Sequence, residues 1–150
     1  MASKTSKRRR VYYAHAICTY GKPDERRDLK RIRSKLSEIS IVNPARGHPL
    51  KLADTMGFCL KLVEDCDIVV FTRLMGKVTS GVGKEVNHAL GLGTPVFELS
   101  DVGFLPRTRK VVYISRRATV NLYEKYLRSL VSGKIKELQQ QLSMLRKRAR

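Results

Sequence analysis

The chain has little of what holds a disulfide-rich domain or a metal site together. Only three cysteines occur among its 150 residues: Cys18, Cys59 and Cys66. An odd number without the spacing of metal ligands argues against a disulfide framework and against a zinc site. The three histidines, His15, His48 and His88, are scattered, and we interpret each as a structural or surface residue. We therefore expect no metal and no cofactor.

Long apolar runs are also missing. No stretch approaches the roughly 20 apolar residues that a membrane-spanning helix needs. The basic start MASKTSKRRR is followed by VYYAHAI, which is too short and too polar for the core of a signal peptide. We expect a protein with no membrane partner and a cytoplasmic location. The length and a hydrophobic content of 42% indicate one domain with its own core.

Acidic residues are scarce. Asp and Glu number 13 against 31 Lys and Arg, which gives a formal net charge of +18 at pH 7. Much of the excess lies in KTSKRRR at the start and RKRAR at the end. We interpret these ends as basic tails that bind RNA or DNA weakly and without sequence preference. No RNA-binding aromatic motif and no helix-turn-helix pattern supports specific recognition.

Strands and helices are expected to alternate along the chain. Apolar runs predict strands at 11–17, 39–45, 67–72, 95–99 and 110–115. Helical spacing predicts helices at 23–39, 48–66, 83–92, 118–131 and 134–148, the last two separated at Gly133. This order predicts an α/β fold: a doubly wound, Rossmann-like or flavodoxin-like, five-stranded parallel sheet with helices on both faces and an extra C-terminal helix. The expected parts are a basic tail (1–10), the α/β domain (11–117) and C-terminal helices with a basic tail (118–150).

A ligand crevice is expected where the strand order changes direction, at the carboxyl ends of the strands. The loops 17–23 and 73–83 would flank it, and the second leads into TSGVGKEVNHAL, residues 79–90. This is not a Walker A loop, because Val78 replaces the first glycine and Glu85 the Ser or Thr after Lys84. The Rossmann glycine pattern is incomplete as well. One explanation is that Glu85, in the first helical turn, favours the positive end of the helix dipole.

A resemblance offers a second explanation. The stretches YYAHAI, GKPDERRDL, DCDIVVFT and SGVGKEVNHALGLGTPV resemble the nucleoside 2-deoxyribosyltransferase superfamily, which includes the nucleoside 5′-monophosphate N-glycosidases. The resemblance covers about residues 11–99, and GVGKE is its most specific part. It implies that Glu85 is a nucleophile that attacks C1′ of the sugar and displaces the base. Tyr12 resembles the tyrosine that contacts this nucleophile, although a strand aromatic in the core would look the same.

The resemblance also implies a substrate. Thr79 stands where deoxyribosyltransferases have an aspartate for the 5′-hydroxyl and where the monophosphate glycosidases have a hydroxyl residue for the 5′-phosphate. An acid there would repel phosphate, whereas Thr79 and the adjacent Ser80 would not, so a nucleoside 5′-monophosphate is the expected substrate or ligand. The expected substrate-binding and phosphate-binding residues are Thr79, Ser80, Gly81, Gly83, Lys84 and Lys22.

One departure from the family lies at Cys59, where the family usually carries an aspartate. A thiol supplies neither the same charge nor the same hydrogen-bond acceptance. Two alternatives to an N-glycosidase or deoxyribosyltransferase therefore stay open. One is a non-catalytic nucleotide-binding or sensing domain, and the other is a basic, ribonucleoprotein-associated protein that kept the enzyme fold.

The C-terminal segment carries an apolar stripe. Ile135, Leu138, Leu142 and Leu145 follow the 3-4-3 spacing of a and d positions over two heptads. We interpret the stripe as packing on its own domain. The resemblance separately implies a homodimer or higher homo-oligomer.

Overall fold

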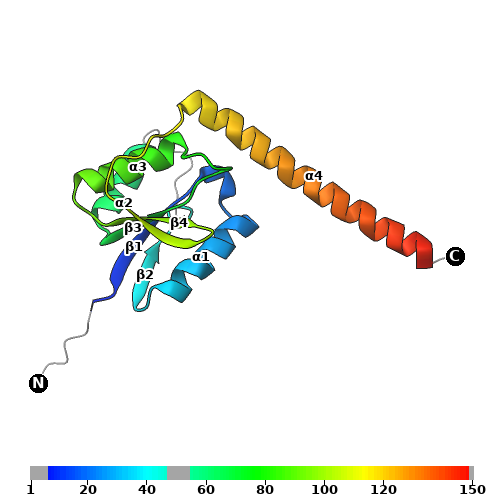
Figure 1. Ribbon diagram of the computed structural model, residues 1–150, viewed down its shortest axis with the longest axis horizontal. Helices are drawn as coiled ribbons and strands as arrows, with labels where there is room; N and C mark the ends of the chain where they lie inside the picture. The colour runs from blue at the N-terminus through cyan, green and yellow to red at the C-terminus, as the bar shows by residue number, and fades with distance from the viewer. Residues whose placement is uncertain (1–6, 47–54, 149–150) are drawn as a thin grey trace, which may run out of the picture.

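The fold is built on a sheet of five strands in the computed structural model, which describes residues 7–46 and 55–148 (Figure 1). The strands are β1 (Arg9–Ala14), β2 (Ile39–Val42), β3 (Ile68–Phe71), β4 (Val96–Ser100) and β5 (Gly103–Arg107). Their order across the sheet is β2-β1-β3-β4-β5. The first four strands are parallel, and β5 is antiparallel to β4. The protein therefore has an α/β fold with a mostly parallel sheet.

The prediction of a fifth parallel strand at 110–115 is wrong. Two residues, Asp101 and Val102, separate β4 from β5, and so short a connection can join antiparallel strands alone, because a parallel return needs a long crossover. Residues 110–115 form no strand and run over a helix instead. Asn87 holds this segment through both backbone groups of Val111, with bonds of 2.8 and 3.1 Å.

The helices are α1 (Pro23–Lys35), α2 (Thr55–Glu64), α3 (Ser80–Gly91) and α4 (Arg116–Arg148), and a short 3-10 turn, η1 (Ile17–Thr19), follows β1. Pro23 opens α1 at a position where its missing N–H costs nothing. The first part of the predicted helix 48–66 lies outside the described residues. Gly93, just beyond α3, has a φ of +75°, as expected for a glycine that ends a helix.

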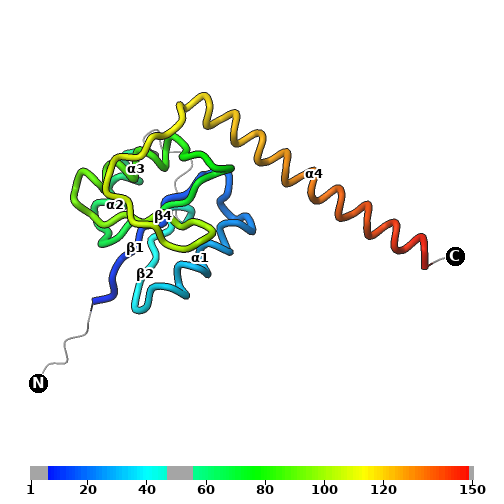
Figure 2. Tube along the Cα trace, in the orientation of Figure 1, coloured from blue at the N-terminus to red at the C-terminus, as the bar shows by residue number. Residues whose placement is uncertain are grey.

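Side chains of β1 point alternately to two packed layers. Tyr12 and Ala14 pack with Val82 and Val86 of α3 and with residues of α2. Their neighbours Val11 and Tyr13 pack with α1 residues instead. The chain trace accordingly shows α2 and α3 together on one side of the sheet and α1 on the other (Figure 2).

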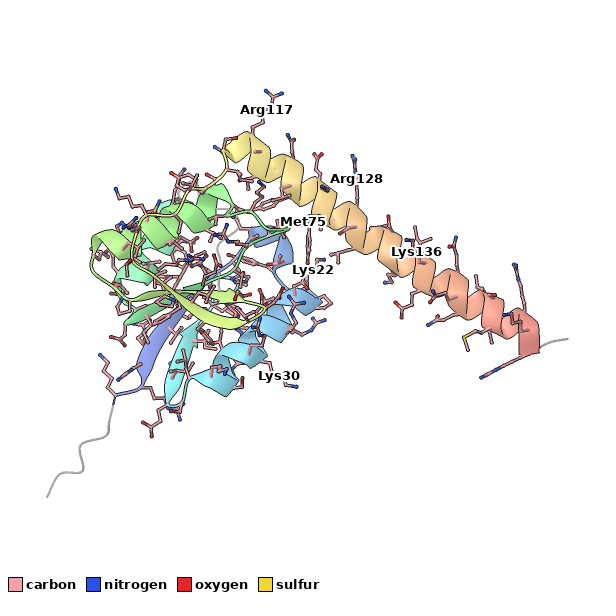
Figure 3. All side chains as sticks on the ribbon, in the orientation of Figure 1. Lys22, Lys30, Met75, Arg117, Arg128 and Lys136 are labelled. Carbon is pink, nitrogen blue, oxygen red and sulfur yellow. The ribbon has the colours of Figure 1, made fainter. Side chains whose placement is uncertain are left out.

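The C-terminal helix α4 is one continuous helix of 33 residues. The prediction of two helices separated at Gly133 is wrong, because a single glycine costs only about 1 kcal/mol in a helix and α4 runs on through it. The first turns of α4 pack on the loops after β1 and β3 through Leu122, Tyr123 and Tyr126. The rest of the helix then leaves the domain (Figure 3).

The prediction that the C-terminal stripe packs on its own domain is also wrong. Ile135, Leu138, Leu142 and Leu145 are 49–60% exposed. Long as α4 is, no helix within the described ranges is both long and apolar enough to cross a membrane.

Candidate functional site

The candidate site lies where the strand order changes direction. The chain passes from β1 to β2 on one side and from β3 to β4 on the other, so the carboxyl ends of β1 and β3 form the switch point. The loop after β3 leads directly into α3, with Thr79 as its N-cap residue. Crevices at such points are the usual ligand sites of open α/β sheets.

Glu85 lies in α3 and belongs to the buried part of this region. Only 6% of its surface is exposed, and Tyr12 of β1 is completely buried. The expectation that Glu85 occupies the first helical turn is wrong, because α3 begins at Ser80 and Glu85 is in its second turn. The helix dipole acts mainly within the first turn. The capping explanation for Glu85 therefore loses its basis.

Three protonated groups share one buried cluster. Burial raises the pKa of Glu85 to about 8, and the nearby Tyr12 hydroxyl acts in the opposite direction. The pKa of Tyr12 is raised by burial first and by Glu85 second. The thiol of Cys59 lies beside Tyr12, and burial raises its pKa to about 11. At neutral pH the cluster carries little charge.

Two oxygens in this cluster lack hydrogen bonds of ordinary geometry. Within the described part of the chain, these are the Tyr12 hydroxyl and Glu85 Oε2. Buried polar groups are nearly always paired, so an unpaired one needs an explanation. The Glu85 carboxyl and the Tyr12 hydroxyl lie close enough to shift each other's pKa, and both have hydrogen-bonding capacity left for a ligand.

Thr79, at the start of α3, also has a buried side-chain oxygen without a hydrogen bond among the described residues. Its side chain is buried, and its hydroxyl also lacks a partner within the described ranges. The adjacent Ser80 is buried as well, and its N–H donates to Oγ1 of Thr119 in α4 at 3.0 Å. The phenol of Tyr123, also in α4, lies near both Thr79 and Glu85, and burial raises its pKa.

Thr119 and Tyr123 were missed in the sequence because no local motif connects them to the glycine-rich segment. They lie some 40 residues further along the chain. Only the packing of α4 on the loops after β1 and β3 brings them to the site. The first turns of α4 thus close the candidate site from one side.

The two glycines of the segment have different surroundings. A β-carbon at Gly83 would overlap the ring of Tyr113, whereas one at Gly81 would meet only the methyl of Met56 at 3.6 Å. Gly83 thus allows the close approach of Tyr113. A ligand could reach the backbone of Gly83 only if Tyr113 moved away.

The two lysines that were predicted to bind the substrate lie further from the buried cluster. Lys84 lies on the exposed side of α3, away from buried Glu85. Lys22 is the N-cap residue of α1, in the loop after β1, and is partly exposed (Figure 3). The structure thus brings Tyr12 and Glu85 together, with Thr79 and Ser80 at the start of the same helix, and leaves Lys84 outside.

His15 is a buried structural residue at the end of β1, and it is not isolated. Its Nδ1 lies 3.0 Å from the carbonyl of Tyr13, and its Nε2 lies 2.7 Å from Oε2 of Glu25. The carbonyl can only accept, so Nδ1 carries a proton, and Nε2 faces the Glu25 carboxyl. Burial lowers the pKa of His15. This pair fixes the loop after β1 to the start of α1.

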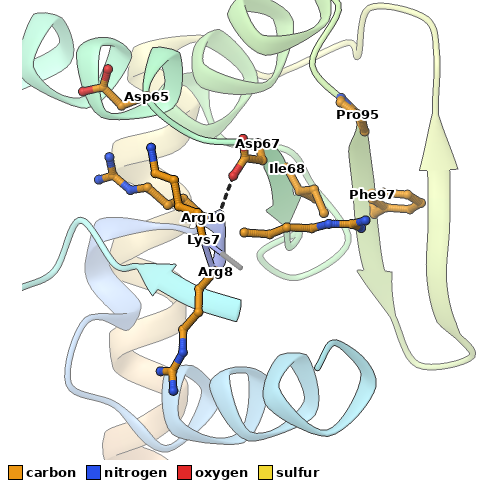
Figure 4. Close-up of a pocket in the computed structure, with 9 residues that line it drawn as sticks. Lys7, Arg8, Arg10, Asp65, Asp67, Ile68, Pro95 and Phe97 are labelled. Atoms are coloured by element: carbon orange, nitrogen blue, oxygen red, sulfur yellow. Dashed lines mark hydrogen bonds between the residues drawn. The ribbon is translucent and has the colours of Figure 1, made fainter. Parts of the chain in front are cut away.

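A second feature lies at the opposite, amino-terminal end of the sheet (Figure 4). A hollow of about 730 Å³ is lined by Lys7, Arg8, Arg9, Arg10, Asp65, Asp67, Ile68, Pro95 and Phe97. Asp67 links the two central strands here, because its Oδ2 accepts the N–H of Arg10 at 2.8 Å. Part of the predicted basic tail therefore belongs to β1 and lines a basic surface hollow.

Comparisons with protein-family models, with curated proteins and with solved structures found no match. Membership of the deoxyribosyltransferase superfamily therefore stays a prediction. Within residues 7–46 and 55–148, no group of three or more His, Cys, Asp and Glu side chains could hold a metal ion.

Proposed function

We propose that this chain is a nucleoside 2-deoxyribosyltransferase-like protein that cleaves or transfers the N-glycosidic bond of a nucleoside 5′-monophosphate. The observation that carries the proposal is the buried pair of Glu85 and Tyr12 below the start of α3, at the switch point of the sheet. The doubly wound class belongs to the same proposal. It is supported by the strand order and by the two packed layers on β1.

The chemistry requires a carboxylate beside the sugar. Breaking the bond between C1′ and the base places positive charge on the sugar ring, and a nearby carboxylate stabilises that charge. Glu85 then bonds to C1′ while the base leaves with the bonding electrons and takes up a proton. Water completes hydrolysis by displacing the Glu85 ester, and a second base would complete transfer.

The raised pKa of Glu85 fits this role. In the closed site Glu85 keeps its proton near neutral pH because burial disfavours the charge. The positive charge that develops on the sugar favours the ionised form at the moment of reaction. The Tyr12 hydroxyl, which lies near Glu85, would donate to that carboxylate.

The 5′-phosphate would lie at the start of α3. The N-terminus of a helix favours anions, and the buried hydroxyl of Thr79 is unpaired among the described residues. Substrate entry requires the segment 108–115 to move, because Tyr113 covers Gly83. Hydrogen bonds hold that segment against α3 and the loop before it: the two between the Asn87 side chain and Val111, and the Ile114 N–H donated to the carbonyl of Val78 at 3.0 Å.

The test is release of free base from a panel of ribonucleoside and deoxyribonucleoside monophosphates, followed by chromatography. We expect release from at least one of them, loss of release in Glu85→Gln, and retention in Lys84→Gln, a control at the exposed neighbour. If wild type is active and Glu85→Gln keeps most of that activity, the nucleophile is assigned wrongly.

Binding of nucleotides and of RNA distinguishes the two alternative functions. A monophosphate that binds without base release would favour the non-catalytic nucleotide-binding or sensing domain. Absence of both binding and release, with tight RNA binding at high salt, would favour the ribonucleoprotein-associated protein. The basic hollow lined by Lys7, Arg8, Arg9 and Arg10 is the observation that supports this last alternative.

A further inference from the structure

Helix α4 carries an exposed apolar stripe beyond its contact with the domain. The stripe consists of Val120, Leu127, Val131, Ile135, Leu138, Leu142 and Leu145, each 42–60% exposed. At about 100° per residue these side chains fall within an arc of roughly 80°, on one side of the helix over about 38 Å. From Leu127 to Leu145 the stripe is therefore a continuous apolar surface on a projecting helix.

The stripe is separate from the face by which α4 contacts the domain. That face carries Leu122, Tyr123, Tyr126 and Leu130 and packs around Ala16, Cys18 and Leu74. Helical stability in proteins comes mostly from packing an apolar face, and a projecting helix with a bare face has no such support. Exposed apolar surfaces of this extent mark interaction sites.

We propose that the stripe binds the same stripe of a second copy of this chain, with the two α4 helices antiparallel. The spacing is nearly symmetric about a point between residues 136 and 137. An antiparallel pair then sets Ile135 against Leu138, Val131 against Leu142, and Leu127 against Leu145 of the second copy. These six side chains each meet another apolar one, as a self-complementary twofold interface requires, and Val120 lies outside the paired part.

Charge favours the antiparallel direction. Glu124 lies within the arc of the stripe, between Val120 and Leu127, and the helix ends in Arg146, Lys147 and Arg148. An antiparallel pair brings Glu124 of each copy near the basic end of the other. A parallel pair would set glutamate against glutamate and the three cations against the same three, and like charges facing one another destabilise an interface.

The area is sufficient for a stable contact. The six paired side chains of each copy are about half exposed and would remove roughly 1,100 Å² from solvent when two copies pair, close to the lower end of stable specific interfaces. The inference is independent of the proposed glycosidase chemistry, because no residue of the stripe belongs to the buried cluster of Tyr12, Cys59 and Glu85.

The first test measures the mass of the full-length chain by light scattering and sedimentation. We expect a dimer for wild type and a monomer for Leu138→Glu with Leu142→Glu, with the dissociation constant raised at least about 100-fold. The matched control is Gln140→Glu with Ser143→Glu, which adds the same charge to the opposite, exposed side of α4 and should stay dimeric. Circular dichroism verifies that each variant keeps its fold.

The second test determines whether the two α4 helices are antiparallel or parallel. Leu127→Cys and Leu145→Cys are made separately in a Cys18→Ser background, since Cys59 and Cys66 are buried. On oxidation, the mixture should form a disulfide between the two different variants, and neither variant alone should cross-link. A monomeric wild type, or a dimer that survives the paired glutamates, overturns the proposal. Cross-linking within each single variant overturns the antiparallel arrangement.

Discussion

Replacing Glu85 with glutamine should stabilise the protein, and by an amount that depends on pH. Glutamine keeps the shape of the side chain and removes the titrating group. Folding raises the pKa of Glu85 from 4.5 to about 8 because the carboxyl is buried. A carboxyl whose pKa rises on folding holds its proton more tightly in the folded state. Its presence therefore costs nothing below pH 4.5 and destabilises the protein increasingly as the pH rises towards 8.

The magnitude follows from the pKa difference. Each pKa unit corresponds to about 1.4 kcal/mol, so Glu85 lowers the free energy of unfolding by about 3 kcal/mol at pH 7 and by about 5 kcal/mol above pH 9. This is a large share of the roughly 5–15 kcal/mol that stabilises a typical domain. The excess stability of Glu85→Gln over wild type should grow by the same amounts.

Guanidinium unfolding of both proteins between pH 4 and pH 9 measures this difference. Subtracting wild type from the variant cancels the other titrating groups, including the buried His15. Glu137→Gln, on an exposed part of α4, is the control for the loss of one carboxyl group. A constant difference for Glu85→Gln would show that Glu85 titrates normally, and the buried-nucleophile reasoning would fail.

Three further outcomes follow from the same features. Base release should increase as the pH rises towards about 8, because the Glu85 nucleophile acts only once its proton has left; a rate that falls between pH 6 and pH 8 contradicts this. A nucleoside monophosphate should bind about tenfold or more tightly than its nucleoside, and Thr79→Asp should remove that preference in calorimetry, because a carboxylate repels phosphate. Equal affinities in wild type would remove the phosphate site. Changing Lys7, Arg8 and Lys147 to glutamine should weaken RNA binding and lower the slope of log affinity against log salt by up to about 0.9 for each phosphate that is no longer neutralised; an unchanged slope in filter binding contradicts it.

Much of the fold was predictable because the signals are local. The apolar runs of β1, β3 and β4 and the spacing of Leu29 and Ile32 in α1 each lie within one element and were identified to within a few residues. The antiparallel β5 was missed for a tertiary reason. Its sequence GFLPR contains a proline, which is tolerated on an edge strand, whereas the β-branched run at 110–115 has the stronger strand propensity.

The site was predictable in part. Glu85, Tyr12 and Thr79 could be selected from a resemblance and are found buried near one another. Tyr113 and Thr119, which pack over the start of α3, could not be identified from the sequence. They reach α3 only after the chain has passed through β4 and β5. The exposure of the stripe on α4 was equally invisible, since spacing shows that a face is apolar but not what lies against it.

The hydrogen bond from the Ser80 N–H to Thr119 Oγ1 fastens the base of α4 to the start of α3. From that attachment to Arg148 the helix extends about 44 Å, so a tilt of about 10° at its base displaces its far end by about 8 Å. A small rotation of α4 where it is attached, beside the candidate site, therefore moves its free end by a much larger distance. A pair of spectroscopic labels, one on the domain and one near Arg148, would read a rearrangement around Thr79 as a change in distance far larger than the rearrangement itself.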